Sequence, residues 1–158
     1  MIKDLVRPEL VFGDIDARTR DDALTVLARS IAQRNAAVDG AQLLETLRQR
    51  EVQATTAFGD GVAIPHARLR GLERMIVAFA RSTTGIDWGA PDKRPVHLIL
   101  MLAGPAEKPE VYLRALAAAS RLLRDAQCRA RLLTAPTSDE LLRILREDGG
   151  KGGGAAAA

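Results

Sequence analysis

The chain has few of the side chains that most often carry out chemistry. Its 158 residues include one cysteine and two histidines. An internal disulfide is therefore excluded, and a zinc site built from four nitrogen or sulfur ligands has almost no material. We expect neither a metal ion nor a cofactor. Any histidine or thiol chemistry has to come from His66, His97 or Cys128.

Aromatic residues and long hydrophobic runs are also scarce. Aromatics make up 3% of the chain and are scattered, whereas single-stranded nucleic-acid surfaces combine clustered basic charge with aromatic stacking. The longest apolar stretch, residues 96–103, is far shorter than the roughly 20 residues that cross a bilayer. The first residues lack the apolar core of a secretory signal. We expect a cytoplasmic protein that neither binds nucleic acid nor inserts into a membrane.

The charge of the chain leaves two explanations open. Lysine and arginine number 23 against 20 acidic residues, which gives a formal charge of +3, and most of the basic residues are arginine. Arginine is well suited to binding phosphate, so one explanation is an anionic partner. The other is a compositional preference for arginine and alanine. The row Arg114, Arg121 and Arg124 has near-helical spacing and is interpreted as a solvated helix face.

The length and the 47% hydrophobic content indicate one globular domain. Neither an internal repeat nor a linker divides the chain. The last ten residues, GGKGGGAAAA, are of low complexity. We therefore predict a domain over residues 1–148 and a flexible tail over residues 149–158.

Hydrophobic periodicity predicts helices at both ends of the domain. Thr19 is a candidate N-cap for the first helix, and a second helix is expected from about Asp39 to Glu51. In the C-terminal part, Pro109 can open a helix, a short helix follows a break near residue 125, and Ser138 resembles the N-cap of a last one. About three helices are thus expected after the middle of the chain.

The middle of the chain is rich in strands. Met75–Ala80 and Val96–Leu102 are apolar on both faces, as in a sheet covered by helices on two sides. Residues 52–71 read as a loop, a short strand near Val62–Ile64 and another loop, and residues 9–12 as a short strand or an extended entry. The order of elements predicts an α/β fold, a three-layer α/β/α sandwich with a mixed sheet.

The segment from Arg50 to Arg68 offers a set of groups suited to a phosphorylated histidine. A neutral imidazole such as that of His66 is a nucleophile near pH 7 and can attack a phosphoryl donor. Arg50 can supply a cation, and the hydroxyl of Thr55 or Thr56 a hydrogen bond, while glycine-flanked amides offer further donors. An exposed histidine without a function is the alternative reading of the same residues. The glycine pattern is neither a Walker loop nor a complete GxGxxG.

The run from Gly59 to Arg68, GDGVAIPHAR, together with Arg50-Glu51 and Thr55-Thr56, resembles the IIA domains of the mannitol/fructose class of the phosphoenolpyruvate-dependent phosphotransferase system. The resemblance covers about residues 5–147 and implies the same sheet-and-helix sandwich. It also implies that His66 accepts a phosphoryl group from the small carrier HPr or its nitrogen-branch relative, and that Arg50 is the matching arginine.

Three positions depart from the pattern of that family: Tyr112, Ala57 and Phe58, which is bulkier than the usual aliphatic residue. Its members commonly carry a second histidine at the start of the long C-terminal helix, where this chain has Tyr112. A phenol can hydrogen-bond a phosphoryl oxygen or orient the imidazole, but it carries no positive charge. The usual glycine after the two hydroxyl residues is replaced by Ala57, which has less backbone freedom.

The resemblance implies a phosphocarrier of the nitrogen-regulatory type, whose binding to regulatory targets depends on phosphorylation. A sugar-specific IIA that passes phosphate to a IIB domain is an alternative, as is an interaction module that has lost phosphotransfer. Outside this segment, His97 is interpreted as a strand-end side chain. Cys128 is interpreted as a spare helical thiol, and the alternative is a thiol whose pKa the neighbouring arginines lower.

Overall fold

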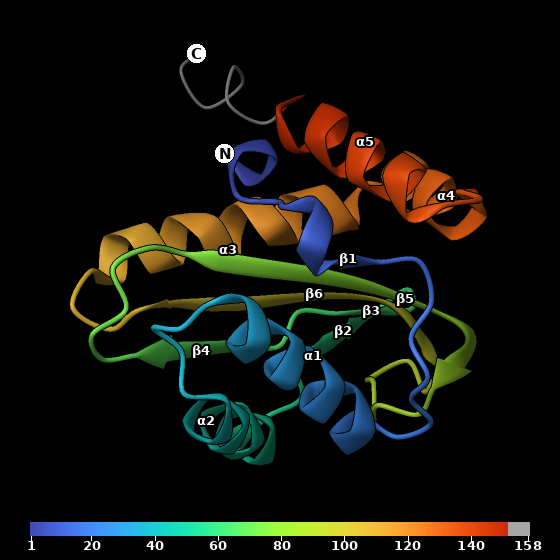
Figure 1. The fold of residues 1–158 in the computed structure, drawn as a ribbon. Helices are drawn as coiled ribbons and strands as arrows, with labels where there is room; N and C mark the ends of the chain where they lie inside the picture. The colour runs from blue at the N-terminus through green and yellow to red at the C-terminus, as the bar shows by residue number, and fades with distance from the viewer. Residues whose placement is uncertain (152–158) are drawn as a thin grey trace.

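The computed structural model describes residues 1–151 and shows a mixed sheet between two layers of helices (Figure 1). One face of the sheet is covered by α1 (Arg20–Arg34) and α2 (Gly40–Gln53). The other face is covered by α3 (Pro109–Arg124), α4 (Ala126–Thr134) and α5 (Ser138–Gly149). Two short 3-10 helices, η1 (Ile2–Asp4) and η2 (Pro8–Leu10), precede the first strand. The predicted three-layer sandwich is confirmed.

The sheet has six strands in the order β1-β5-β6-β3-β2, and β4 also pairs with β6. The strand β6 is central: it lies antiparallel to β5 and parallel to both β3 and β4. The strands β3 and β4 therefore run one after the other along the same side of β6. The bounds are β1 (Val11–Phe12), β2 (Ala57–Gly59), β3 (Val62–Ala63), β4 (His66–Leu69), β5 (Ile76–Ile86) and β6 (Val96–Pro105).

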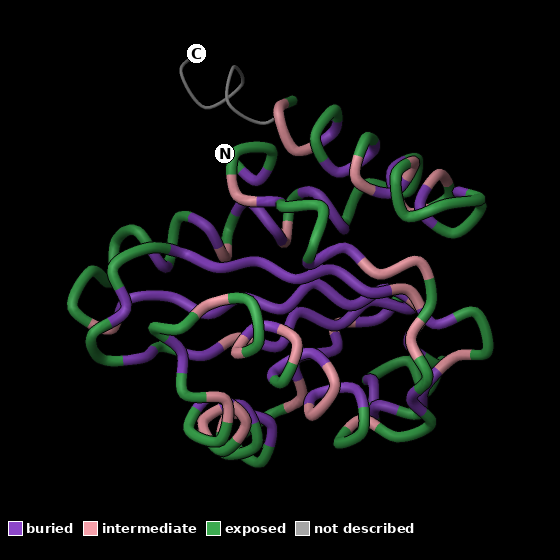
Figure 2. Tube along the Cα trace, in the orientation of Figure 1, coloured by how far each residue is buried: buried purple, intermediate pink, exposed green. Residues whose placement is uncertain are grey.

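The two central strands supply the apolar cores on both sides of the sheet, and Figure 2 shows most of their length as buried. Alternate side chains of β5 and β6 point to opposite faces. The residues Ala78, Ala80, Ile99 and Met101 pack with α1 and α2. The residues Val77, Phe79, Leu98 and Leu100 pack with α3, α4 and α5. This double burial explains why both strands lack a polar face.

Helix caps account for most of the helix boundaries. The Thr19 hydroxyl accepts a hydrogen bond from the backbone N–H of Asp22, as expected of an N-cap. Asp39 caps α2, which continues beyond the expected end at Glu51. The prediction for α5 was wrong by one residue: Thr137 is the N-cap, and Ser138 is the first helical residue. Because both residues carry a hydroxyl, the sequence alone does not separate them.

The region between α2 and β5 contains more sheet than expected. The prediction of one strand between two loops was wrong, because β2, β3 and β4 all form there, and His66 begins β4. These strands have two to four residues, too short to show an alternating pattern, and β3 and β4 form by pairing with β6. The strand β5 is also longer than expected and reaches Ile86. At the N-terminus, residues 9–12 divide between η2 and β1.

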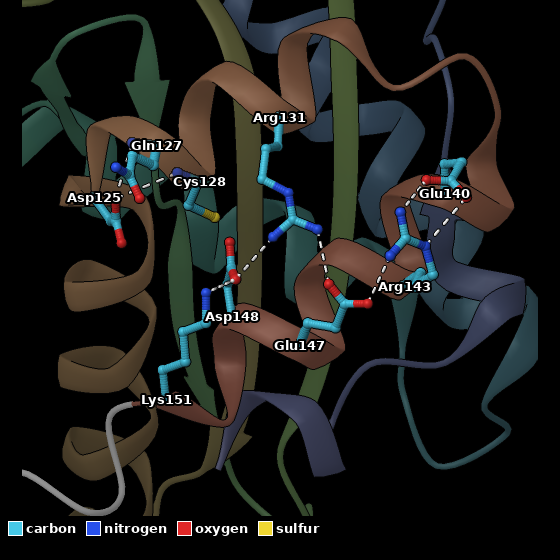
Figure 3. Close-up of polar contacts among 9 residues, drawn as sticks. All are labelled: Asp125, Gln127, Cys128, Arg131, Glu140, Arg143, Glu147, Asp148 and Lys151. Atoms are coloured by element: carbon cyan, nitrogen blue, oxygen red, sulfur yellow. Dashed lines mark hydrogen bonds and ion pairs between the residues drawn. The ribbon is translucent and has the colours of Figure 1, made fainter.

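An ion-pair network links α4 to α5 at the C-terminal end of the domain (Figure 3). Arg131 of α4 binds Glu147 at 2.8 Å and Asp148 at 3.0 Å, and Lys151 binds Asp148 at 2.7 Å. The predicted tail began at residue 149, yet Gly149 ends α5 and Lys151 takes part in this network. The rest of that tail, residues 152–158, lies outside the described residues. Among residues 1–151, none of the helices has the length and apolar character needed to cross a membrane.

Candidate functional site

His66 begins strand β4 at an edge of the sheet, where β6 is the partner strand. Its Nδ1 lies 2.7 Å from the carbonyl oxygen of Ile64. A carbonyl oxygen only accepts hydrogen bonds, so Nδ1 carries the hydrogen. In the neutral ring, the lone pair is then on Nε2. The backbone on the N-terminal side of His66 thus sets the tautomer of a nucleophilic imidazole.

The surroundings of His66 favour the neutral ring. Burial is the main cause that lowers its pKa below the ordinary value of 6.5, and the cations Arg50 and Arg68 lower it further. The hydrogen bond to Ile64 and the charge of Glu51 act in the opposite direction and are outweighed. His66 is half-buried. At neutral pH it is therefore unprotonated and able to act as a nucleophile.

A cleft of about 460 Å³ opens beside this histidine. It lies between α2, β4 and the first turns of α3, and the lining combines cationic, amide, hydroxyl and aliphatic side chains. The lining residues are Thr46, Gln49, Arg50, Gln53, His66, Ala67, Arg68, Tyr112, Leu113 and Leu116. Two of them carry positive charge and none is acidic. A cleft with this lining is suited to an anion such as a phosphoryl group.

Arg50 reaches the cleft from the last turn of α2. Its Nη1 donates a hydrogen bond to the carbonyl oxygen of Ala54 at 2.8 Å, which satisfies a free carbonyl at the end of the helix. The other donors of the guanidinium make no hydrogen bond or ion pair within residues 1–151. Arg50 is thus anchored by one nitrogen and keeps donors for a ligand.

Tyr112 lies in the first turn of α3, which Pro109 opens as predicted. The centroid of its ring is 6.1 Å from that of His66. The ring packs closely against Gly104 of β6, where a Cβ would lie 2.7 Å from the Cδ2 of Tyr112. Burial raises the pKa of Tyr112 to about 12, so the phenol keeps its proton at neutral pH. Positions 66 and 112 therefore lie side by side at one end of the cleft.

The sequence reasoning did not select Arg68 as a site residue. Arg68 follows His66 by two positions in β4, so both side chains leave the strand on the same face. Its guanidinium carbon lies 5.7 Å from the centroid of the Tyr112 ring. The sequence signal was that Arg68 follows His66 by two residues. This spacing places both side chains on one face only if residues 66–69 form a strand.

The two threonines of the expected site support its backbone and do not line the cleft. The Thr55 hydroxyl accepts a hydrogen bond from the backbone N–H of Ala57 at 3.1 Å. Thr56 is buried, and its hydroxyl and backbone N–H both donate to the carboxylate of Glu51. Thr56 in turn accepts, through its carbonyl oxygen, the N–H of Ile64 at 3.1 Å. Glu51 was a second residue that sequence reasoning missed, because its burial depends on tertiary packing.

Other candidates from the sequence lie apart from this cleft. The glycine turn at residues 59–61 precedes Val62, which pairs with Leu98, whereas His66 pairs with Leu102 further along β6. The backbone amides of the glycine turn therefore lie too far along β6 to donate hydrogen bonds beside His66. His97 bonds through Nδ1 to the carbonyl oxygen of Ser82 at 2.8 Å, as a strand-end side chain.

The interpretation of Cys128 as a spare helical thiol agrees with the structure, and the alternative of a lowered thiol pKa is wrong. The side chain is fully buried, and burial, together with Asp148, raises its pKa to about 12. The neighbouring arginines lie close in sequence, but only Arg131 has a lowering effect, and it is a small one. Within residues 1–151, groups of three or more histidine, cysteine, aspartate or glutamate side chains that could hold a metal ion are absent.

Comparison with known proteins gives a consistent assignment. Residues 4–148 match the family described as "Phosphoenolpyruvate-dependent sugar phosphotransferase system, EIIA 2". A nitrogen regulatory protein of Bradyrhizobium diazoefficiens is 36% identical over 144 residues, which cover 91% of this chain and 94% of that protein. The fructose-specific EIIA component of Haloferax volcanii is 34% identical over 139 residues, covering 88% and 90% of the two chains.

The fold agrees with a solved structure as well. The nitrogen regulatory protein IIA-Ntr of Neisseria meningitidis superimposes with a TM-score of 0.84 at 26% identity, over 91% of this chain and 98% of that chain. The match of the family to residues 4–148 includes every residue that lines the cleft. This chain therefore belongs to the EIIA 2 family of the phosphoenolpyruvate-dependent sugar phosphotransferase system.

Proposed function

We propose that this protein is a phosphocarrier of the nitrogen-regulatory type, which accepts a phosphoryl group on His66 and binds its targets according to phosphorylation state. The observation that carries the proposal is a neutral histidine in a cleft with two arginines and no acidic side chain. His66 is the acceptor, Arg50 and Tyr112 contact the phosphoryl group, and Thr55 and Thr56 hold the backbone that leads to His66. The reaction takes place in the cytoplasm and uses neither a metal ion nor a cofactor.

The transfer needs little covalent chemistry from the protein. The lone pair of His66 Nε2 forms a bond to phosphorus while the bond between phosphorus and the donor breaks, and the electrons of that bond return to the donor atom. The hydrogen on Nδ1 stays in its bond to Ile64, so His66 loses no proton in the step and its ring becomes a phosphorylated imidazolium with one positive charge. Positioning and charge stabilisation dominate such a transfer. Arg50 supplies the charge, and the protonated phenol of Tyr112 supplies a hydrogen bond.

A donor protein can approach the cleft over exposed apolar side chains. Leu113 is 59% exposed and, together with the half-buried Leu116, lines the cleft next to Tyr112. Exposed leucines beside a reactive group are typical of a transient protein contact. We propose that the donor is an HPr-like carrier, which covers these leucines during transfer. Regulatory targets or a IIB domain would use the same face.

Phosphorylation changes the charge of this face. The His66 ring is neutral before transfer; afterwards the phosphoryl group brings about −1.5 to −2 charges, and the ring, which keeps the Nδ1 hydrogen, carries one positive charge. A target that binds the two uncompensated cations in one state therefore meets a less positive site, with an anionic group at its centre, in the other. The 36% identity to a nitrogen regulatory protein supports the regulatory reading, while the 34% identity to a fructose-specific component keeps sugar transport as the second candidate.

The central test is phosphorylation by a reconstituted donor system. The full chain is incubated with phosphoenolpyruvate, enzyme I and an HPr-like carrier, and its intact mass is measured. We expect one phosphoryl group that is labile in acid and stable in base, and its absence from His66→Ala. A wild-type chain without the mass gain would refute the phosphocarrier. The same gain in His66→Ala would instead refute the site.

Two further measurements separate the regulator from its alternatives. Efficient transfer from the phosphorylated chain to a fructose- or mannitol-type IIB domain would favour the transport component. Target binding that is equal for wild type, His66→Ala and His66→Asp would favour an interaction module that does not depend on phosphorylation. The regulator predicts neither result, because its binding should differ between the two phosphorylation states.

A further inference from the structure

The positive charge of Arg68 has no counter-ion in the described structure. The ion pairs within residues 1–151 belong to other cations, such as Arg48 with Asp21 and Arg131 with Glu147. The Arg68 side chain is exposed and lies on the face of the Tyr112 ring, 5.7 Å from its centroid. A guanidinium held by an aromatic face keeps its N–H donors, because they lie in its own plane. Arg68 is thus fixed in position but has not used its hydrogen bonds.

We propose that Arg68 is the second phosphoryl-binding cation of this cleft, opposite Arg50, and that the ring of Tyr112 is the platform that positions it. This inference rests on the function proposed above. Arg68 would bind an oxygen of the phosphoryl group on His66 as the group arrives and while it remains. Tyr112 would then act in two ways, through its hydroxyl on the phosphoryl group and through its ring on Arg68.

The backbone fixes the relative positions of these groups. His66 and Arg68 are two residues apart in β4, which places their Cα atoms roughly 6.6 Å apart. Arg68 pairs with Gly104 of β6, and Gly104 is also the residue against which the Tyr112 ring packs. The absence of a side chain at Gly104 lets the ring approach the sheet directly beneath Arg68. The strand β4 therefore carries both the nucleophile and the cation, and the Tyr112 ring of α3 packs against its partner strand β6.

The two arginines reach the cleft from different layers of the fold. Arg50 comes from α2, on the face of the sheet opposite α3, whereas Arg68 leaves the edge strand beside Tyr112 of α3. Both lower the pKa of His66 and that of Tyr112, so both are electrostatically close to the two rings. A phosphoryl group on Nε2 would therefore have a cation on each side. Two cations can balance the two charges of the phosphoryl dianion.

The test uses phosphoramidate, a small phosphoryl donor that does not depend on docking of a protein. His66 Nε2 attacks its phosphorus, the bond to nitrogen breaks and ammonia leaves. The variants are Arg68→Gln and Arg68→Lys, Tyr112→Phe and Tyr112→Leu, with Arg121→Gln as a control. Arg121 lies nine residues after Tyr112 on α3, about 13 Å along the helix axis, and its substitution removes the same charge. Thermal unfolding shows whether each variant is folded.

We measure the rate of phosphorylation and the pKa of the bound phosphoryl group by ³¹P NMR. Arg68→Gln should slow phosphorylation about tenfold, which is the scale of one charge-assisted hydrogen bond. It should also raise the pKa of the phosphoryl group, because a nearby cation favours the dianion. Arg68→Lys should recover part of both effects, and Arg121→Gln should behave as wild type. Tyr112→Phe loses only the hydroxyl and should raise the phosphoryl pKa less than Tyr112→Leu, which also loses the platform and should shift the pKa at least as much as Arg68→Gln does.

Each contrary result overturns a distinct statement. If neither phosphoramidate nor the carrier system phosphorylates wild type, the proposed function fails. If wild type is phosphorylated and Arg68→Gln matches Arg121→Gln in rate and phosphoryl pKa, the role of Arg68 is refuted while the function stands. If Tyr112→Phe shifts the phosphoryl pKa as much as Tyr112→Leu, the hydroxyl of Tyr112 and not its ring is responsible, and the platform is refuted.

Discussion

The buried carboxylate of Glu51 accepts both the backbone N–H and the hydroxyl of Thr56, and so joins the end of α2 to the first residues of the β2 region. Glu51 is 5% exposed and Thr56 7% exposed. Arg20 of α1 lies 4.0 Å from the same carboxylate. The carbonyl of Thr56 then receives the N–H of Ile64, whose own carbonyl binds His66. A short chain of polar contacts thus connects Glu51 to the nucleophile.

Replacing Glu51 should therefore weaken the fold. In Glu51→Gln, one carboxylate oxygen becomes an NH₂ group, which cannot accept a hydrogen bond. Either the backbone N–H or the hydroxyl of Thr56 would then lose its buried acceptor. We expect the free energy of unfolding to fall by about 2 kcal/mol, the usual scale for a lost buried hydrogen bond to a charged group. Urea unfolding at pH 7 measures it. Glu45→Gln changes an exposed residue of the same helix and should stay within about 0.5 kcal/mol of wild type. Equal stability of the two variants would contradict the assignment.

The lowered pKa of His66 predicts a pH profile for phosphoryl acceptance. Protonation is less favourable in the folded chain than in the unfolded one, where the pKa is near 6.5. The rate constant should therefore fall toward low pH as His66 becomes protonated, with a midpoint below pH 6.5, and should be level well above that midpoint. The stability contributed by the neutral ring is likewise present above pH 6.5 and is lost as the pH falls through the folded pKa.

NMR titration of the His66 ring checks this profile with two variants of opposite effect. Arg50→Gln removes a cation and should raise the pKa of His66. Glu51→Gln removes an anion and should lower it further. The exposed Arg29 of α1 provides a charge control, and Arg29→Gln should leave the titration unchanged. Movement of both site variants in the same direction would contradict the electrostatic account.

Gly104 is expected to be sensitive to the smallest enlargement. A Cβ at this position would overlap the sulfur of Met75 and lie 2.7 Å from Tyr112 Cδ2. Methionine can move aside, but the buried tyrosine ring cannot. We expect Gly104→Ala to lose about 1–3 kcal/mol of unfolding free energy and to displace the ring from His66. Gly13→Ala, whose Cβ would have ordinary contacts of 3.7 Å or more, is the matched control. Urea unfolding and the ring resonances of Tyr112 report both effects.

Cys128 should be chemically inert in the native chain. Its pKa of about 12 leaves almost no thiolate at pH 8, and the side chain is fully buried. The thiolate is the reactive form, so modification by a disulfide reagent should require unfolding. We expect slow labelling in buffer and rapid labelling in urea at the same pH. Rapid labelling of the native chain would show that the contact of Cys128 with Asp148 is open in solution.

The fold was accessible from the sequence because its central parts have strong local signals. Residues 76–80 and 96–103 are mainly apolar on both faces, which indicates strands buried between two layers, and the threonine and aspartate caps mark the helix starts. The short strands around His66 have no comparable signal. They form because a neighbouring strand satisfies their backbone groups, and that pairing involves residues more than 30 positions away.

By itself, the sequence determined the class of the fold, the family and one candidate nucleophile, because periodicity, caps and the motif around His66 are local patterns. Only the tertiary structure decided which charges surround that nucleophile. It placed Arg50 and Arg68 in one cleft and buried Glu51 against Thr56. It also raised the pKa of Cys128, which excludes the lowered thiol pKa that the nearby arginines left open as an alternative. The physical reason is that burial and the distances between charges depend on how the layers pack. Residues that are near in sequence can therefore differ strongly in their exposure to solvent.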